Sequence, residues 1–293
     1  MNADLRIETP RWTAEVSLYG GQLLRASCTD SSHPVIWLGS RAQSGSGQAI
    51  RGGVPICWPW FGASPVPGRP AQGFARLCQW ELEQLGPDFV RMRLSGEQIS
   101  PELRDFPFEL SSEIRLGESL ELSLQMKNTG PKPIGITLAL HTYLAVGDCE
   151  KVRLFGLEQA PFTVKGGPEL HDGPGPLAIR GECCRLYCPQ TGPVRIYDPV
   201  WHRTITVEKR NSHSTLIWNP GPERARQIED LAPKEYRQFI CVEANRAGTD
   251  FLALVPHEPV TIRQRIRVDN QVDNPRVTGD GLHAPGKRPE KQQ

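Results

Sequence analysis

The chain has 293 residues, of which 34 are Lys or Arg and 33 are Asp or Glu, so its formal net charge is +1. This balance argues against a polybasic nucleic-acid binder and against a protein held at a membrane surface by its charge. No stretch has the ~18 apolar residues that a membrane span needs, and the N-terminus MNADLRIETPRW lacks the apolar core of a secretory signal. We therefore expect a globular, cytoplasmic protein.

The dominant hydrophobic period along the chain is two, which is typical of half-buried β-strands. In SLELSLQMK, the apolar residues Leu120, Leu122, Leu124 and Met126 alternate with polar ones. Segments with this pattern lie at residues 12–18, 90–94, 110–116, 120–126, 134–140, 204–207, 239–243 and 260–268. Turns rich in Gly, Pro and Asn separate many of them, and helices such as one at residues 224–231 are expected to be short. The sequence therefore predicts an all-β sandwich or barrel.

The segments form no repeat of fixed period, and no linker divides them. We expect a single catalytic β-sandwich domain over residues 1–271. From residue 272 to residue 293 the chain loses apolar content and ends in charged and amide residues, so this tail is expected to be disordered or loosely attached. Nothing in the pattern sets an oligomeric state, and a monomer is compatible with it.

The eight cysteines do not form two CxxC pairs, so a zinc site is disfavoured. The one cluster, CCRLYC with Cys183, Cys184 and Cys188, is interpreted as ordinary strand thiols, reduced as in a cytosolic protein. The chain also lacks a glycine-rich nucleotide-binding fingerprint. We expect neither a metal nor a cofactor.

Four short segments could carry chemistry. RGGVPICWPWFG at residues 51–62 combines an arginine with glycines, prolines and aromatic residues, which suits a stiff ligand-binding loop, although such a loop could equally cap the sandwich. QGFAR occupies residues 72–76, His141 follows an alternating strand, and Glu243 follows the apolar run FICV. Taken singly, a histidine or glutamate at a strand end is more often a surface residue than a catalyst. The order of the segments is more informative than any one of them.

In that order, and together with the turn Trp218-Asn219-Pro220-Gly221, these segments resemble the glucose-6-phosphate 1-epimerases of the aldose 1-epimerase superfamily. The resemblance covers roughly residues 10–270. It implies the galactose-mutarotase-like β-supersandwich of antiparallel sheets, and an isomerase that interconverts the α and β anomers of a hexose 6-phosphate without cofactor or metal. Opening and reclosing the sugar ring needs one group to take a proton from the anomeric hydroxyl and another to protonate the ring oxygen.

The resemblance assigns the base to Glu243 and the acid to His141, which must then be protonated when substrate binds. A phosphate dianion and an ionised Glu243 would both favour the imidazolium. The phosphate-binding arginines are expected to be Arg51 and Arg76, since guanidinium groups bind phosphate in a bidentate manner.

Further residues near the substrate are assigned less firmly by the pattern. Trp58 and Phe61 could cover the apolar face of the sugar or could pack the loop. Asp230, in QIEDLAP, matches a recurrent family residue and is expected to be structural.

The sequence departs from the family pattern at two substrate-binding positions. Gln72 stands where the family usually has histidine, and Cys184 stands where it usually has an aspartate. Gln72 can still hydrogen-bond to hydroxyls but cannot carry a proton. The departures leave two alternatives open: a mutarotase of an unphosphorylated or modified aldose, and a non-catalytic sugar-phosphate-binding sandwich. The second is disfavoured because binding alone does not require both His141 and Glu243.

Overall fold

Antiparallel strands dominate the computed structural model, which describes residues 3–45 and 47–270. The expected C-terminal tail at residues 272–293 lies outside these residues. The helical elements are the short helix α1 (Gly221–Ala225) and the 3₁₀ turns η1 (Ala75–Leu77), η2 (Gly96–Gln98) and η3 (Glu235–Gln238). Among the described residues, no helix combines the length and apolar character needed to cross a membrane. The all-β prediction is confirmed, while the helix expected at residues 224–231 is shorter and begins earlier.

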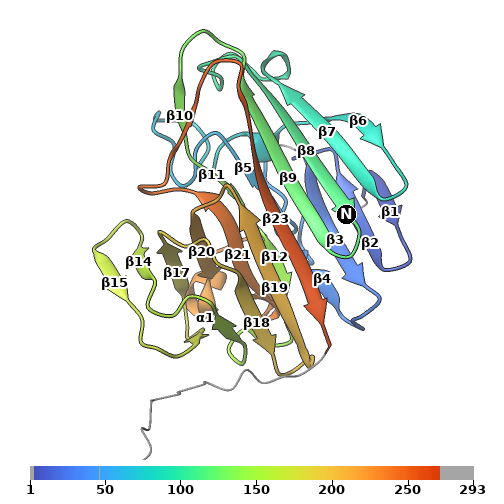
Figure 1. Ribbon diagram of the computed structural model, residues 1–293, viewed down its shortest axis with the longest axis vertical. Coiled ribbons are helices and arrows are strands. Elements are labelled where there is room, and N and C mark those ends of the chain that lie inside the picture. The colour runs from blue at the N-terminus through green and yellow to red at the C-terminus, as the bar shows by residue number, and fades with distance from the viewer. Residues whose placement is uncertain (1–2, 46, 271–293) are drawn as a thin grey trace, which may run out of the picture.

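Two large sheets and one small sheet make up the fold (Figure 1). The larger sheet follows the order β1 (Leu5–Glu8), β2 (Trp12–Ser17), β3 (Gln22–Cys28), β4 (Pro34–Ile36), β12 (Tyr143–Ala145), β21 (Phe239–Arg246), β20 (Ser214–Asn219), β17 (Cys183–Tyr187), β14 (Pro161–Val164) and β15 (Glu169–His171), with β11 (Leu138–Leu140) joining β21 and β5 (Ile56–Cys57) joining β11. The second follows the order β16 (Leu177–Ala178), β13 (Arg153–Phe155), β18 (Val194–Asp198), β19 (Arg203–Arg210), β23 (Pro259–Asp269), β9 (Leu120–Asn128), β8 (Phe108–Leu116), β7 (Phe89–Ser95) and β6 (Glu81–Leu85). The small sheet pairs β10 (Ile134–Ile136) with β22 (Leu252–Leu254).

The two large sheets bury their facing sides in one hydrophobic cluster. In β8 and β9 every second side chain is buried, as the period of two predicts. A polar bridge also crosses this core: Thr142 donates a hydrogen bond to Gln264 Oε1, and Gln264 Nε2 donates one to the carbonyl of Val242, at 3.0 Å. The residues that alternate with Thr142 and Val242 therefore point to the other face of the larger sheet.

The predicted strand at residues 134–140 is two strands. Its first part, β10, pairs with β22, and its second part, β11, pairs with β21. At the break the amide of Thr137 donates to the carbonyl of Pro59, and beyond β11 the amide of His141 donates to the carbonyl of Pro55. The proline-rich loop thus takes hydrogen bonds that a continuous ladder would otherwise use, and it comes to lie beside His141.

The same loop is anchored by Trp58, whose side chain is fully buried. Its indole ring lies 5.6 Å from Phe74, 5.7 Å from Phe106 and 4.5 Å from Phe108, measured between ring centroids. Aromatic rings at such distances pack favourably in a protein core. Trp58 therefore packs the loop, and the expectation that it covers a sugar is corrected.

We predict that Trp58→Ala lowers the free energy of unfolding by about 3–5 kcal/mol, the usual cost of removing a large buried aromatic side chain. Phe61→Ala is the matched control, because Phe61 belongs to the same loop but is only partly buried; it should cost less than about 1.5 kcal/mol. Urea denaturation of both variants measures the difference. Equal losses would show that the indole does not anchor the loop.

Candidate active site

A cavity of about 1080 Å³ opens on the face of the larger sheet opposite the sandwich core. Its walls come from the loops on either side of β5, from the β11–β12 junction, from β17 and β20, from the β14–β15 hairpin and from α1. The expected site residues that line it are Arg51, Phe61, Gln72, Arg76, His141 and Cys184. The structure thus brings together residues separated by up to 133 positions, from Arg51 to Cys184.

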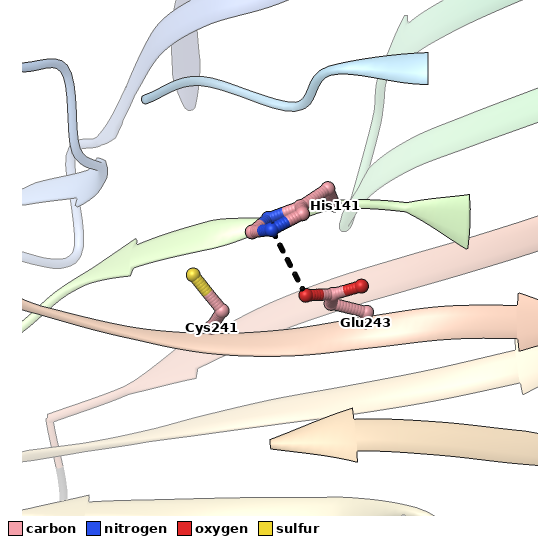
Figure 2. Close-up of side chains that lie close together, drawn as sticks. All are labelled: His141, Cys241 and Glu243. Atoms are coloured by element: carbon pink, nitrogen blue, oxygen red, sulfur yellow. Dashed lines mark ion pairs between the residues drawn. The ribbon is translucent and has the colours of Figure 1, made fainter. Parts of the chain in front are cut away.

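His141 lines this cavity and faces Glu243, which is fully buried and is not among the lining residues. His141 lies between β11 and β12, and Glu243 lies in the middle of β21, with which both strands pair. The distance from His141 Nε2 to Glu243 Oε1 is 3.2 Å (Figure 2). Only 13% of the His141 side chain is exposed, and none of the Glu243 side chain is. Glu243 is therefore not a solvated strand-end residue, the alternative that its sequence position favoured.

Burial sets the protonation of this pair. Burial raises the pKa of Glu243 well above its usual value, although a hydrogen bond from Asn245 Nδ2 to Oε2, at 3.3 Å, opposes this shift. Burial, reinforced by the positive charges of Arg51 and Arg76, lowers the pKa of His141 to about 3. Both shifts favour the uncharged forms, a neutral imidazole and a protonated carboxyl, and the pair is best treated as a unit.

The surroundings of His141 thus oppose the imidazolium, burial most of all, and its expected protonation when substrate binds stays a prediction. Oε1 of Glu243 has its 3.2 Å contact to Nε2 of His141 and no other partner among the described residues, and Nδ1 of His141 has no hydrogen-bond partner among them. Buried polar groups left unpaired are costly.

Three arginines line the cavity, Arg51, Arg76 and Arg224, and their surroundings differ. Arg51 lies 3.0 Å from Asp230 Oδ1 and donates a 3.1 Å hydrogen bond to the hydroxyl of Tyr143, whose ring stacks on His141 at 4.8 Å. Asp230, expected to be structural, thus holds Arg51 and offsets its charge. Arg76 donates to the carbonyl of Ala71 at 2.9 Å, Arg224 donates to Gln227 Oε1 at 2.8 Å, and neither has a carboxylate partner among the described residues. Their charges are therefore available to an anion.

Gln72 holds the loop that carries Phe61. Its side-chain oxygen accepts a 2.8 Å hydrogen bond from the backbone amide of Gly62, and the backbone amide of Gln72 donates to the Gly62 carbonyl. The next residue, Gly73, has a φ of +68°, and an added Cβ there would lie 2.1 Å from the carbonyl oxygen of Trp58. The QGFAR segment therefore needs glycine for close backbone approach, and Gln72 has a structural role beside any role in binding.

Cys184, on β17, lines the cavity, and burial raises the pKa of its thiol. Trp218, from the turn noted in the sequence, also lines the cavity, and so do Tyr143 and Lys165, to which the sequence assigned no role. The period of two could have indicated Tyr143, because it lies two residues beyond His141 on an extended segment. No local signal marks Lys165, which reaches the cavity from the β14–β15 hairpin and pairs with Glu182 at 3.0 Å.

Among the described residues, one group could ligate a metal: His141, Cys241 and Glu243, whose donor atoms all lie within 4.8 Å of one another. All eight cysteines are free thiols. Cys241 comes from the same strand as Glu243, two residues earlier, and therefore shares its face.

Comparison with known proteins shows which family has this fold and this cavity. Residues 4–267 match the sequence profile of the Aldose 1-epimerase family. A protein of Escherichia coli (strain K12) named "Putative glucose-6-phosphate 1-epimerase" is 33% identical over 270 residues, which cover 89% of each chain.

Solved structures agree. The "putative mutarotase (YeaD)" of Salmonella typhimurium superposes with a TM-score of 0.80 at 29% identity, covering 90% of this chain and 89% of that one. A galactose mutarotase related enzyme from Lactobacillus acidophilus, only 13% identical, superposes with a TM-score of 0.70 over 92% of this chain and 98% of its own, and shows the shared fold alone. The expected galactose-mutarotase-like architecture is thus confirmed. Because the family profile and the relatives extend over most of its length, the chain belongs to the aldose 1-epimerase family and is an isomerase of the epimerase type.

Proposed function

We propose that this epimerase interconverts the anomers of a hexose 6-phosphate, with glucose 6-phosphate as the first candidate. The observation that carries the proposal is Arg76, a guanidinium without a carboxylate partner among the described residues, in the same cavity as the His141–Glu243 pair. A rigidly held arginine is well suited to a phosphate group. The relatives named as glucose-6-phosphate 1-epimerases support the same substrate class.

In the proposed reaction Glu243 takes the proton of the anomeric hydroxyl while His141 gives its proton to the ring oxygen, and the C1–O5 bond breaks. The anomeric hydroxyl oxygen and the ring oxygen are both bonded to C1. Glu243 and His141, 3.2 Å apart, can therefore exchange protons with the two oxygens in the same step. One proton enters the pair and one leaves it, which keeps its proton count constant. Rotation about C1–C2 exposes the other face of the aldehyde, and closure reverses both transfers.

The substrate itself would prepare the acid. Burial lowers the pKa of His141, and the positive charges of Arg51 and Arg76 lower it further. A phosphate dianion bound at Arg76 offsets that charge, so the shared proton can move from Glu243 to His141 within the pair. A sugar without the phosphate leaves the arginine field in place, which gives a physical reason for preferring phosphorylated substrates.

Exchange NMR between the equilibrated anomers tests the substrate. We predict that the enzyme accelerates exchange in glucose 6-phosphate more than in glucose or galactose. Arg76→Ala should raise KM for glucose 6-phosphate about 10- to 100-fold, because a charge-assisted hydrogen bond contributes about 1.5–3 kcal/mol, and should change the rate on glucose little. The exposed Arg180 provides the control variant Arg180→Ala. Equal acceleration of glucose would favour the unphosphorylated-aldose alternative instead.

We predict that His141→Asn and Glu243→Gln each lower kcat for this exchange by at least about a hundredfold, since positioned acids and bases contribute that much. Circular dichroism and thermal melting should show both variants folded. Near-normal turnover in either variant would remove that residue from the proposed proton transfers, and normal turnover in both would leave only the binding-protein alternative.

Burial of the proposed base also predicts a pH dependence of stability. An unfolded Glu titrates near pH ~4.3, whereas the folded state holds the proton of Glu243 to higher pH. Between these two pKa values only the unfolded state has lost this proton, so its contribution to stability falls as pH rises. Glu243→Gln should therefore melt at a higher temperature than the wild type at pH 8, and the difference should shrink toward pH 4.5.

Glu258→Gln is the control for this measurement, because Glu258 is exposed. Its melting temperature should follow that of the wild type across the same pH range. A Glu243→Gln variant less stable than the wild type at pH 8 would contradict the unfavourable burial of this carboxylate.

A further inference from the structure

Cys241 contributes a third donor atom beside the His141–Glu243 pair, and the proposed reaction does not use it. Its side chain is fully buried and projects from β21 toward His141, on the same face of the strand as Glu243 (Figure 2). The thiol sulfur, an imidazole nitrogen and a carboxylate oxygen lie within 4.8 Å of one another. Such a set differs from a proton-transfer pair, because sulfur adds affinity for soft cations.

We propose that this triad is a binding site for a borderline-soft divalent cation, of which Zn²⁺ is the example. Zinc binds Cys sulfur, His nitrogen and carboxylate oxygen at about 2.0–2.3 Å, so the donors of a tetrahedral site stand about 3.3–3.8 Å apart. His141 Nε2 and Glu243 Oε1, at 3.2 Å, already have this spacing. The sulfur needs a shift on the order of 1 Å or less to complete it.

The charges of the triad also suit this cation. Binding requires the thiol proton of Cys241 and the proton shared by His141 and Glu243 to leave, so two protons are released. The resulting thiolate and carboxylate balance the two charges of the metal, and a neutral complex avoids the cost of an isolated buried ion. Of the nearby cations, Arg51 is offset by Asp230 at 3.0 Å, while Arg76 opposes binding.

A carboxylate oxygen of the triad also supports a ligand here. Glu243 Oε1, on a side chain with no exposed surface, has its 3.2 Å contact to His141 Nε2 and no hydrogen bond from any other described residue. His141 lines the cavity, so a cation can enter from that side, with the fourth position left to water. Magnesium would fit poorly, because it demands octahedral oxygen ligands.

The consequence is inhibition. A cation bound to Nε2 of His141 and Oε1 of Glu243 occupies the atoms proposed to move protons, so it must exclude turnover. This consequence, unlike the binding itself, rests on the proposed roles of the pair, and binding is therefore measured first by a readout that does not involve activity.

Titration of the metal-free protein with Co²⁺ is that readout, because thiolate-to-cobalt charge transfer absorbs in the near ultraviolet. We expect one Co²⁺ per chain with such a band, displaced by Zn²⁺. The band should be lost in Cys241→Ser and kept in Cys184→Ser, the matched control, since Cys184 is the cavity thiol outside the triad. Glu243→Gln, which retains the thiol, should weaken binding at least about tenfold, because even outer-shell changes cost that much.

Each outcome is decisive. Absence of a stoichiometric band in the wild type, or its survival in Cys241→Ser, overturns the site. If Cys241→Ser does not fold, undiminished Co²⁺ affinity in Glu243→Gln overturns it equally. Zn²⁺ should then inhibit anomer exchange over the range in which it displaces Co²⁺, with recovery on adding EDTA. Binding without inhibition would leave the metal site standing and contradict the proposed roles of His141 and Glu243.

Discussion

The burial of an ionisable carboxylate is the constraint on which the rest of the site depends. Glu243 has no exposed side-chain surface, and an unpaired charge there would be very costly. The protein meets this constraint by placing His141 at 3.2 Å and an amide donor, Asn245, on the other oxygen. The pair can hold one proton without net charge. Because both side chains are buried, solvent does not set their protonation, and a site of this kind can exchange protons with a ligand.

The sheet supplies the rigidity that such a pair needs. Directly behind it, Thr142 and Val242 are tied to Gln264 of the opposing sheet, so the strand positions next to His141 and Glu243 are held from the core side. The arginines of the cavity arrive on loops and on short elements, and Arg51 and Arg76 act on the pair through their charge.

The strands, the all-β class and six of the residues that line the cavity could be predicted from the sequence. Alternation specifies which residues of β8 and β9 are buried, because that pattern is local. The break between β10 and β11, the burial of Trp58 and the Arg51–Asp230 pair could not be predicted in this way. Each depends on contacts between segments far apart in the chain, and the hydrophobic pattern of a single segment does not predict such contacts. The lowered pKa of His141 could not be predicted for the same reason, since it depends on burial and on arginines 65 and 90 positions away.

The two departures from the family pattern, Gln72 and Cys184, have different explanations in the structure. Gln72 uses its side-chain oxygen on the amide of Gly62, so this residue is explained by the loop it holds, whatever the sugar. Cys184 remains a lining residue and presents a weak hydrogen-bonding group where a carboxylate would accept strongly from hydroxyls. The cavity therefore has less means to distinguish one hexose hydroxyl pattern from another than to detect negative charge. Under the proposed function, selectivity would rest on the arginines without carboxylate partners and on the His141–Glu243 pair, because a phosphate and an anomeric centre are common to all hexose 6-phosphates.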